Sequence, residues 1–390
     1  MADVRAVFEP IVQAHLGDTF PACALTVVHQ GTPIVDAAWG WIDPDTQDIP
    51  VTIATYFDLA SITKLFTTLA FLTLVRDGKV RVDDALVGVV PEFSTLNPRA
   101  IDGGQDPHSK QHLPTPPDRA GQTVDPTRVT FRHLLTHTSG LPPWRDVYNV
   151  AGEGTRADRW SRSLSALVRY PFVAPPDGIV RYSDIGLLLL GEAVARLHGA
   201  GDLETAIAAR VLSTLVPHHI VYNPMQHGIP RERIAPTEDD PTWRKRRVWG
   251  EVHDENACGV GGVAGHAGLF ATAQAVAAFG AACLDMSAHF GLSPALSQEV
   301  LSLQAESDGQ RRGLGFALKA AQDSSAGDHM SMRTFGHTGF TGTSLWIDPE
   351  TRLVVALLTN SVYPGRTHGG THEFRRAIHN AVAEMTGMGG

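Results

Sequence analysis

Apolar positions along the chain follow helical and strand periodicities in a definite order. Residues 4–16 carry apolar side chains three and four apart, which predicts a helix, although Pro10 makes an unbroken helix less favourable. Two β-rich runs follow, Ala24–His29 and Ile34–Trp41, and the Gly-containing turn between them is typical of a hairpin. After Ser61 comes a strongly apolar helix closed by an Asp-Gly pair. The N-terminal part is therefore predicted to contribute strands first and a buried helix next.

The remainder of the chain is mainly helical in its middle and returns to strands near its end. The clearest segments are helices at Thr130–Leu135, Ile185–Leu197 and Leu203–Leu215, strands at Gly342–Ile347 and Leu353–Thr359, and a closing helix at Glu373–Met385. Strands at both ends with helices between them predict an α/β lobe built from residues 1–64 and 260–390. A mainly helical lobe, residues 65–259, would be inserted into it.

A long polar stretch, residues 97–128, lacks periodicity and is rich in proline. A segment of this length without repeating structure is either a functional lid or a mobile insertion. We expect it to form a lid at the interface of the two lobes.

Charge and composition narrow the classes of partner. The 390 residues carry 32 Lys+Arg against 41 Asp+Glu, a formal net charge of −9. Nucleic acids and anionic membranes both favour an excess of basic residues, so neither is expected as the main partner. One basic run, Arg244–Arg247, interrupts this pattern, and a solvated loop is the favoured interpretation of it.

The cysteines and the N-terminal residues indicate the cellular compartment in which the protein is expected to act. Three widely separated cysteines without CxxC spacing make a disulfide framework or zinc cluster improbable. Charged residues near the N-terminus occupy the place of the apolar core of a secretory signal. These observations predict a cytoplasmic protein. We expect no metal and no cofactor, and the oligomeric state stays open.

The helix after Ser61 contains the first candidate chemistry. It is apolar on nearly every face, yet Lys64 lies one turn in, where burial would push an ammonium toward its neutral form. Ser61 and Lys64 are three residues apart and would share one helix face, so they could act as a nucleophile and a base. The helix N-terminus could stabilise an oxyanion. The alternative is that Ser61 only caps the helix while Lys64 reaches solvent.

Two further triplets could join this pair. Tyr182-Ser183-Asp184 stands at a predicted helix entrance and could present a phenol together with a second polar group. His337-Thr338-Gly339 precedes a β-rich run, and Gly339 would allow close approach of another backbone. Taken singly, the first could be a helix cap and the second a strand end.

Together the three motifs, in this order and spacing, resemble those of the penicillin-recognising serine hydrolases. This superfamily contains class C β-lactamases, D-alanyl-D-alanine peptidases, D-aminopeptidases and family VIII carboxylesterases. The similarity extends over nearly the whole chain. It includes the runs Phe57–Lys64, His133–Pro142, Val252–Ala257 and Gly262–Phe270, and the last two are similar to a subgroup that includes muropeptide amidases.

The resemblance implies a β-lactamase-like fold, α/β plus all-α, with an antiparallel sheet flanked by helices and an inserted helical lobe. It implies that Ser61 forms an acyl-enzyme and that Lys64 and Tyr182 share the roles of general base and proton shuttle. The backbone N–H groups of Ser61 and Phe340 would form the oxyanion hole. His337 would orient the substrate and the Tyr182 proton, and Thr338 and Gly339 would lie along the substrate.

Two residues depart from the pattern of the superfamily. Asp184 stands where class C β-lactamases carry asparagine, which weakens the case for efficient β-lactam hydrolysis. His337 stands where many relatives carry lysine, which predicts activity that is sensitive to pH near neutrality. His133 and His137 have metal-like spacing, but no carboxylate ligand is evident beside them. His253-Asp254 is expected to fix a loop rather than to act in catalysis.

The resemblance thus implies a serine hydrolase that acts on a small-molecule ester or amide, with carboxylesterase activity on short acyl esters as the first hypothesis. A cytosolic muropeptide amidase or D-amino-acid peptidase, a β-lactamase and an acyltransferase of the same superfamily remain alternatives. A non-catalytic binding protein on the same fold is the alternative of a different class.

Overall fold

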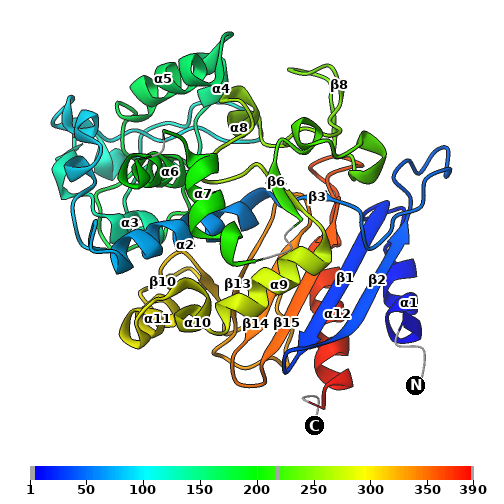
Figure 1. Ribbon diagram of the computed structural model, residues 1–390. Helices are drawn as coiled ribbons and strands as arrows, with labels where there is room; N and C mark the ends of the chain where they lie inside the picture. Colours follow the sequence, from blue (N-terminus) through cyan, green and yellow to red (C-terminus); the bar gives the residue numbers. More distant parts are fainter. Residues whose placement is uncertain (1–4, 200, 216–218, 388–390) are drawn as a thin grey trace.

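A computed structural model describes residues 5–199, 201–215 and 219–387 (Figure 1). Its largest element is an antiparallel sheet of eight strands in the order β10-β11-β12-β13-β14-β15-β1-β2. The strands are β1 (Ala22–His29), β2 (Thr32–Gly40), β10 (Ala305–Ser307), β11 (Gln310–Arg312), β12 (Ala317–Leu318), β13 (Phe335–Thr338), β14 (Ser344–Asp348) and β15 (Leu353–Thr359). The predicted N-terminal hairpin and the two predicted C-terminal strands are confirmed; β14 pairs with β15, and β15 pairs with β1.

Strand alternation divides the core into two layers, one on each face of the sheet. In β15, Val355 and Leu357 pack with residues of α1 (Arg5–Gln13) and α12 (Thr371–Met385), whereas Val354 and Leu358 face the opposite core. Because successive side chains of a strand point to opposite faces, a continuous apolar run is what a sheet covered on both sides requires. The predicted antiparallel sheet flanked by helices is confirmed.

Helix α9 (Ala273–Cys283) covers the face opposite α1 and α12 and lies very close to the sheet (Figure 1). A Cβ atom at Gly280 would lie 2.6 Å from Val354 Cγ1 and 2.9 Å from Leu345 Cδ1. Glycine at this position therefore sets the distance between helix and sheet.

Most of the remaining helices form a group beside the sheet (Figure 1). They are α2 (Thr63–Arg76), α3 (Phe131–Leu135), α4 (Val147–Ala151), α5 (Arg156–Leu167), α6 (Asp184–His198), α7 (Leu203–Arg210) and α8 (Glu255–Gly259), with α10 (Met286–Phe290) and α11 (Pro294–Leu301) nearer the sheet edge. Residues 63–74 of α2 are all buried, and α2 packs on α6 and α7. This agrees with its apolar character on nearly every face.

A small three-stranded sheet connects this group to the large sheet. It contains β3 (Phe57–Asp58), β9 (Leu269–Ala271) and β6 (Ile220–Tyr222), in the order β3-β9-β6. Because β3 leads directly into the turn that carries Ser61, this sheet fixes the start of α2 relative to residues 269–271.

The Pro-rich stretch 97–128 contains short pieces of regular structure rather than a helix. Strand β4 (Arg99–Ala100) pairs with β5 (Thr123–Val124), which closes the stretch at its base. The Arg99 guanidinium is buried between the rings of Phe93 and Phe172, with its carbon Cζ 4.0 and 4.4 Å from the two centroids. Cation–π contacts of this kind favour a desolvated arginine, so the base of the stretch is firmly packed.

The basic run at 244–247 is solvated only in part, because Lys245 and Arg246 are exposed as expected whereas Arg244 and Arg247 are engaged by the fold. Arg244 is buried and donates to the carbonyl oxygens of Val252 and His253 at 2.9 and 3.0 Å. Arg247 lies in β8 (Arg246–Arg247), which pairs with β7 (Asp239–Asp240), and its guanidinium stacks 3.9 Å from the Tyr363 ring centroid. These arginines hold loops together because a guanidinium can serve several carbonyl acceptors at once.

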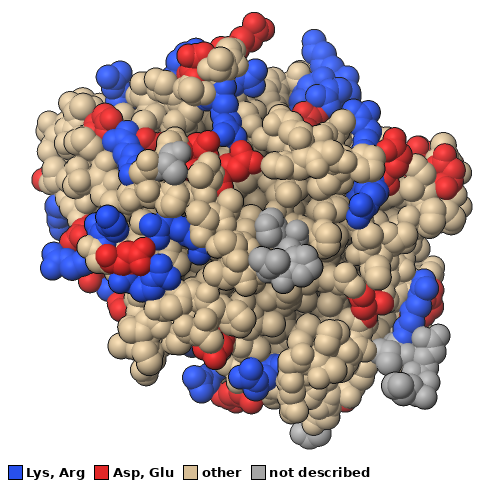
Figure 2. Space-filling view, viewed as in Figure 1, with Lys and Arg blue, Asp and Glu red and all other residues tan. Residues whose placement is uncertain are grey.

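On the face seen in Figure 2, basic and acidic side chains are interspersed, mostly toward the periphery. No helix among the described residues is both long enough and apolar enough to cross a lipid bilayer.

Candidate active site

Ser61 lies in a single 3₁₀ turn, Ala60–Ile62, between β3 and α2. The buried Asp58 carboxylate shapes this turn by accepting the backbone N–H groups of Ala60 at 2.8 Å and His253 at 2.6 Å. Ala60 adopts a φ of 45°, which is unusual for a residue with a side chain and marks a strained turn. Burial raises the pKa of Asp58 to about 6 despite these two donors.

Lys64 contacts three acceptors. Its Nζ donates to Ser61 Oγ at 2.7 Å and to the His266 carbonyl oxygen at 3.1 Å, and it lies 2.8 Å from Asp184 Oδ1. Burial alone would lower the pKa of Lys64, but Asp184 and Tyr182 together more than offset this, and the pKa is raised above its usual value. The expected neutral lysine is therefore wrong. Lys64 is an ammonium held between Ser61 and Asp184.

Tyr182 completes the group around the nucleophile. The Lys64 Nζ lies 4.8 Å from the centroid of its ring, and the phenol forms side-chain hydrogen bonds with Lys64 and Ser61. Burial raises the pKa of Tyr182, and the Lys64 ammonium opposes that rise. Behind the phenol, the ring of His137 packs 4.5 Å away and the Arg312 guanidinium 5.3 Å away, measured to ring centroids.

Ser183 and Asp184 divide the capping and chemical functions of their triplet. Ser183 is the N-cap of α6, since its Oγ accepts the Gly186 N–H at 3.1 Å and donates to the Pro142 carbonyl at 2.7 Å. Asp184, one residue later, points to Lys64 instead. Both interpretations of the triplet thus hold, each for a different residue.

His337, Thr338 and Gly339 lie at the end of β13, facing the same region. His337 is buried, and its Nδ1 is paired with the Thr338 carbonyl at 2.7 Å, which makes that nitrogen the protonated one. Burial and the nearby Arg312 and Lys64 cations hold the pKa of His337 well below its usual range. The expected sensitivity of this histidine near neutral pH is therefore wrong, because it stays neutral there.

Gly339 allows the close backbone approach that the sequence suggested. A Cβ atom at this position would lie 2.6 Å from the carbonyl oxygen of Leu59, two residues before Ser61, and 2.1 Å from Thr343 Oγ1. The absence of a side chain thus brings the end of β13, and with it Phe340, next to the nucleophile turn.

The two histidines with metal-like spacing have separate structural roles. His133 caps α3, where its Nδ1 accepts the Thr130 N–H at 3.1 Å. His137 has a φ of 59°, and its Nδ1 accepts the Ser183 N–H at 3.0 Å. They do not share a ligand position. His253-Asp254 fixes its loop as expected, because the His253 N–H donates to the Asp58 carboxylate and the Asp254 carboxylate accepts the Ala257 N–H; the His253 imidazole has no hydrogen bond among the described residues.

A cluster of Asp184, Asp254 and His266 lies beside Lys64, with one donor atom of each within 4.8 Å of the others. His266 Nε2 pairs with Asp254 Oδ1 at 2.8 Å, and Asp184 pairs with the Lys64 ammonium. Asp254 also caps α8 by accepting the Ala257 N–H at 2.7 Å. Each member already has a partner, so the cluster serves to hold Lys64 and its surrounding loops.

Ser61, Tyr182 and Phe340 line two hollows. The larger, about 590 Å³, also contains His337, Thr338 and Gly339, together with Arg311, Arg312, Arg366 and Arg375. We call it the arginine hollow. The other, about 270 Å³, is bounded by Lys110, Trp144, His253, Glu255 and Arg366, and we call it the strap hollow. A substrate bond over Ser61 would have space on both sides.

Sequence reasoning missed several residues of this region. Arg312 and Arg375 carry no motif. Arg312 reaches the hollow from β11, which β12 separates from β13 in the sheet, and Arg375 reaches it from α12, where its Nη2 donates to the carbonyl oxygens of Gly339 and Thr343. His137 was noted only for its spacing to His133. Its position within the run His133–Pro142, one of those that resemble the superfamily, was the available signal that it belongs near Tyr182.

Comparisons with known proteins identify a family model and relatives that match most of this chain. A family model described as Beta-lactamase matches residues 5–380. Putative D-alanyl-D-alanine carboxypeptidases of Salmonella agona (strain SL483) and Salmonella typhi are each 28% identical over 372 residues, which covers 90% of this chain and 81% of theirs.

Solved structures with a similar fold have lower sequence identity. EstCE1, a hydrolase with promiscuous acyltransferase activity, has a TM-score of 0.72 at 18% identity and covers 97% of this chain and 98% of its own. Unliganded simvastatin synthase (LovD) from Aspergillus terreus has a TM-score of 0.70 at 19% identity, with coverage of 99% and 100%. A penicillin-binding protein homologue from Caulobacter crescentus has a TM-score of 0.68 at 18% identity, with coverage of 97% and 98%.

Proposed function

The chain belongs to the Beta-lactamase family, and from that premise we propose that it is a serine hydrolase that cleaves an ester or amide through an acyl-enzyme on Ser61. The observation that carries this proposal is the 2.7 Å contact between Lys64 Nζ and Ser61 Oγ. The Tyr182 phenol is hydrogen-bonded to both side chains. A nucleophile in contact with a proton-transferring pair is the arrangement that covalent catalysis needs.

The base is the Lys64–Tyr182 pair acting as a unit after it has lost one proton. In that form the proton remaining on the pair is shared between the amine and the phenol, and the pair titrates as one group. As Ser61 Oγ bonds to the substrate carbonyl carbon, its proton passes to the pair, which then gives it to the leaving group as that bond breaks. In deacylation the pair takes a proton from water, and Ser61 recovers it when the acyl bond breaks.

The carbonyl oxygen that becomes negative during attack needs preorganised donors. The backbone N–H groups of Ser61 and Phe340 are the candidates, because Gly339 brings the two segments together at the junction of both hollows. Asp184 and His337 act indirectly. The first keeps the Lys64 ammonium in place, and the second stays neutral beside Tyr182.

Short acyl esters are the first substrates to test. The experiment measures intact-protein mass after brief mixing with p-nitrophenyl butyrate, together with nitrophenol release, for wild type and Ser61→Ala. An acyl-sized adduct, or rapid release, in the wild type alone supports the proposal. Equal reactivity of both proteins refutes Ser61 as the nucleophile. Ligand binding that is unchanged by Ser61→Ala, with turnover in neither protein, would instead indicate a binding protein.

A second candidate, a carboxypeptidase acting on a peptide with a free terminal carboxylate, is favoured by the arginine hollow. Four arginines line it against a single carboxylate, that of Asp323. Arg312 is about nine-tenths buried, its Nε has no hydrogen-bond partner, and no ion pair with a carboxylate is found for it among the described residues. A buried guanidinium without a counter-ion favours an anionic ligand.

The test compares a peptide ending in D-alanyl-D-alanine with the same peptide ending in an amide. Release of D-alanine from the free acid, with little cleavage of the amide, supports the carboxypeptidase. Arg312→Gln should remove that preference, whereas Arg333→Gln, an exposed arginine outside the hollow, should keep it. Equal cleavage of both peptides, or no release of D-alanine, would count against this candidate.

A further inference from the structure

The segment Gln105–His112, which we call the strap, is ordered by its own hydrogen bonds. The Asp106 carboxylate accepts the N–H groups of His108 at 3.0 Å and Ser109 at 2.6 Å. The Gln105 side chain donates to the Lys110 carbonyl at 3.0 Å. Asx turns of this kind give a loop a defined shape, so the strap is a compact unit within the Pro-rich stretch.

An ion pair between the buried Arg145 and the partly exposed Asp102, three residues before the strap, holds the start of the strap against the helical group. The Arg145 side chain is only 2% exposed, and its Nη2 donates to both Asp102 carboxylate oxygens at 2.6 and 2.7 Å. The backbone N–H of Asp146 donates to Gln105 Oε1 at 3.2 Å. Arg145 lies just after the run His133–Pro142, whose His137 packs against Tyr182. The strap is therefore anchored to a segment that also contacts Tyr182.

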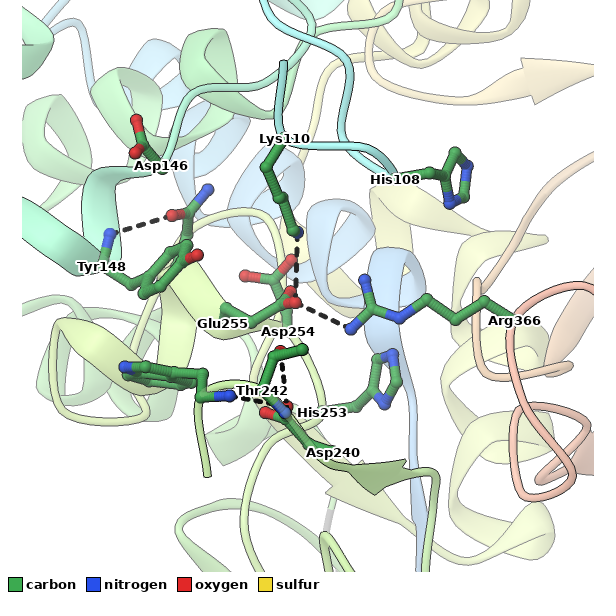
Figure 3. A network of polar contacts seen from close by, with 12 residues as sticks. His108, Lys110, Asp146, Tyr148, Asp240, Thr242, His253, Asp254, Glu255 and Arg366 are labelled. Carbon is green, nitrogen blue, oxygen red and sulfur yellow. Dashed lines mark hydrogen bonds and ion pairs between the residues drawn. The ribbon is translucent and has the colours of Figure 1, made fainter. Parts of the chain in front are cut away.

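The tip of the strap reaches across to the opposite wall of the strap hollow (Figure 3). Lys110 Nζ donates to Glu255 Oε1 at 3.2 Å, and the same oxygen accepts Arg366 Nη2 at 2.7 Å. Lys110 Nζ also lies 4.2 Å from the Trp144 ring centroid, and the His108 ring lies 6.1 Å from that of Phe340. The strap therefore lines the strap hollow but not the arginine hollow, although Ser61 borders both.

The charges of this wall neutralise one another. The Glu255 carboxylate forms ion pairs with both Lys110 and Arg366. Arg366 also binds the Glu238 carboxylate through two of its nitrogens. Two carboxylates and two cations thus leave no net charge on this network, and the two other carboxylates that line the hollow, Asp184 and Asp254, pair with Lys64 and His266. This contrasts with the arginine hollow, where the buried Arg312 has no ion pair among the described residues.

The size and lining of the strap hollow limit what can enter. Its volume of about 270 Å³ is less than half that of the arginine hollow, about 590 Å³. Pro107, Pro143, Trp144 and Phe340 supply apolar surface between the paired charges. A compact, uncharged portion of a substrate fits these conditions, whereas a long chain would run into the strap.

We propose that the strap hollow is the subsite for the compact, uncharged portion of the substrate, and that Lys110 is the positioning residue that sets its upper size limit. The inference rests on the proposed acyl-enzyme at Ser61. Lys110 touches the strap hollow but acts by holding the strap against Glu255 and Trp144. Its side chain is 31% exposed, so the contact is weak enough that its loss loosens the strap without unfolding the chain.

The experiment measures kcat and KM for two ester series in wild type and Lys110→Ala. One series varies the acyl chain of p-nitrophenyl esters from acetate to octanoate, and the other varies the alcohol of butyrate esters from methyl to octyl. The wild type should lose kcat/KM with length in one series, which identifies the portion that enters the hollow. In Lys110→Ala the ratio of long-chain to short-chain kcat/KM in that series should rise about fivefold, mainly through KM.

Two further variants separate positioning from general stability. Lys110→Arg can reach Glu255 and Trp144 and should restore the wild-type length limit. Lys79→Ala removes an exposed lysine at the end of α2 and should behave as wild type. Ser61-dependent turnover with the same length profile in wild type and Lys110→Ala would overturn the inference. An equal loss at all lengths would also overturn it. Turnover that survives Ser61→Ala, or no turnover at all, would instead refute the proposed function on which it rests.

Discussion

The Asp184 carboxylate lies 2.8 Å from the ammonium of Lys64, a residue 120 positions earlier in the chain. Lys64 is only 1% exposed, and a buried ammonium without a counter-ion would be strongly destabilised. Asp184 thus both permits the burial of Lys64 and raises the pKa of the lysine. Class C β-lactamases carry an asparagine at this position. The Asp184 carboxylate of this chain holds the proton on the Lys64–Tyr182 pair more tightly than a neutral amide would.

Asp184→Asn is therefore expected to move the pH dependence of kcat/KM to lower pH. The Lys64–Tyr182 pair must lose one proton before it can accept that of Ser61, and both pKa values are raised in the wild type. The kcat/KM of the wild type should rise with pH. Removal of the Asp184 charge should shift this rise to lower pH by about one pH unit or more. The measurement is a pH–rate profile with p-nitrophenyl butyrate.

Ser61→Ala supplies the blank for spontaneous ester hydrolysis in that profile. Asp177→Asn, which alters a carboxylate paired with Arg181 outside the group around Ser61, is the matched control and should leave the limb in place. A limb that does not move in Asp184→Asn would show that Asp184 does not govern the proton affinity of the base.

His337→Gln should lower kcat without moving the rising limb. The neutral imidazole holds the Thr338 carbonyl and packs beside Tyr182 at 5.9 Å between ring centroids. The pKa of His337 lies well below the usual range of histidine. His337 is therefore protonated only at a lower pH than the one at which the Lys64–Tyr182 pair titrates. A loss of roughly tenfold or more in kcat is expected. A shift of the limb between pH 6 and 8 would mean that His337 titrates during catalysis.

Several elements followed directly from local pattern. The hairpin of β1 and β2 and the pairing of β14 with β15 come from runs of apolar, β-branched residues separated by turn residues. The buried character of α2 follows from its apolar faces. The three motifs could be located because each has a short local spacing, and the geometry then brings Ser61, Lys64, Tyr182 and His337 together.

Long-range electrostatics could not be obtained in this way. The pKa of Lys64 depends on Asp184 and that of His337 on Arg312, and neither pair is close in sequence. Arg244 likewise looked solvated because it stands in a charged run, whereas its acceptors are carbonyls that tertiary folding brings to it. Periodicity reports which side chains are apolar, but it does not report which charges meet.

Acid should destabilise the fold through buried neutral histidines, and His379 offers a test away from the nucleophile. It is fully buried in α12, with Nδ1 2.6 Å from the Arg375 carbonyl, and burial lowers its pKa to about 4. The unfolded chain, with a histidine pKa of about 6.5, binds the proton first as pH falls. Stability is therefore present above pH 6.5 and is lost between about pH 6.5 and 4, by about 2 kcal/mol from pH 7 to pH 5.

Urea unfolding at pH 7 and pH 5 measures this loss. His379→Gln keeps an N–H donor near the Arg375 carbonyl but cannot be protonated, so it should lose about 2 kcal/mol less than wild type over the same interval. His289→Gln, which changes an exposed histidine, is the control and should follow the wild type. Equal losses in wild type and His379→Gln would show that His379 is not the source.

Gly339→Ala should separate the end of β13 from the nucleophile turn. The added methyl group would lie 2.6 Å from the Leu59 carbonyl and 2.1 Å from Thr343 Oγ1, so one of these segments must move. Overpacking of this kind costs about 1–3 kcal/mol of stability. A displacement of about 1 Å between Ser61 and Phe340 should reduce kcat/KM by roughly a hundredfold. Gly88→Ala adds a methyl group where no atom lies within 4 Å and serves as the control. Thermal melting and p-nitrophenyl butyrate kinetics of both variants decide the matter, since wild-type activity in Gly339→Ala would mean that this close approach does not position the oxyanion donors.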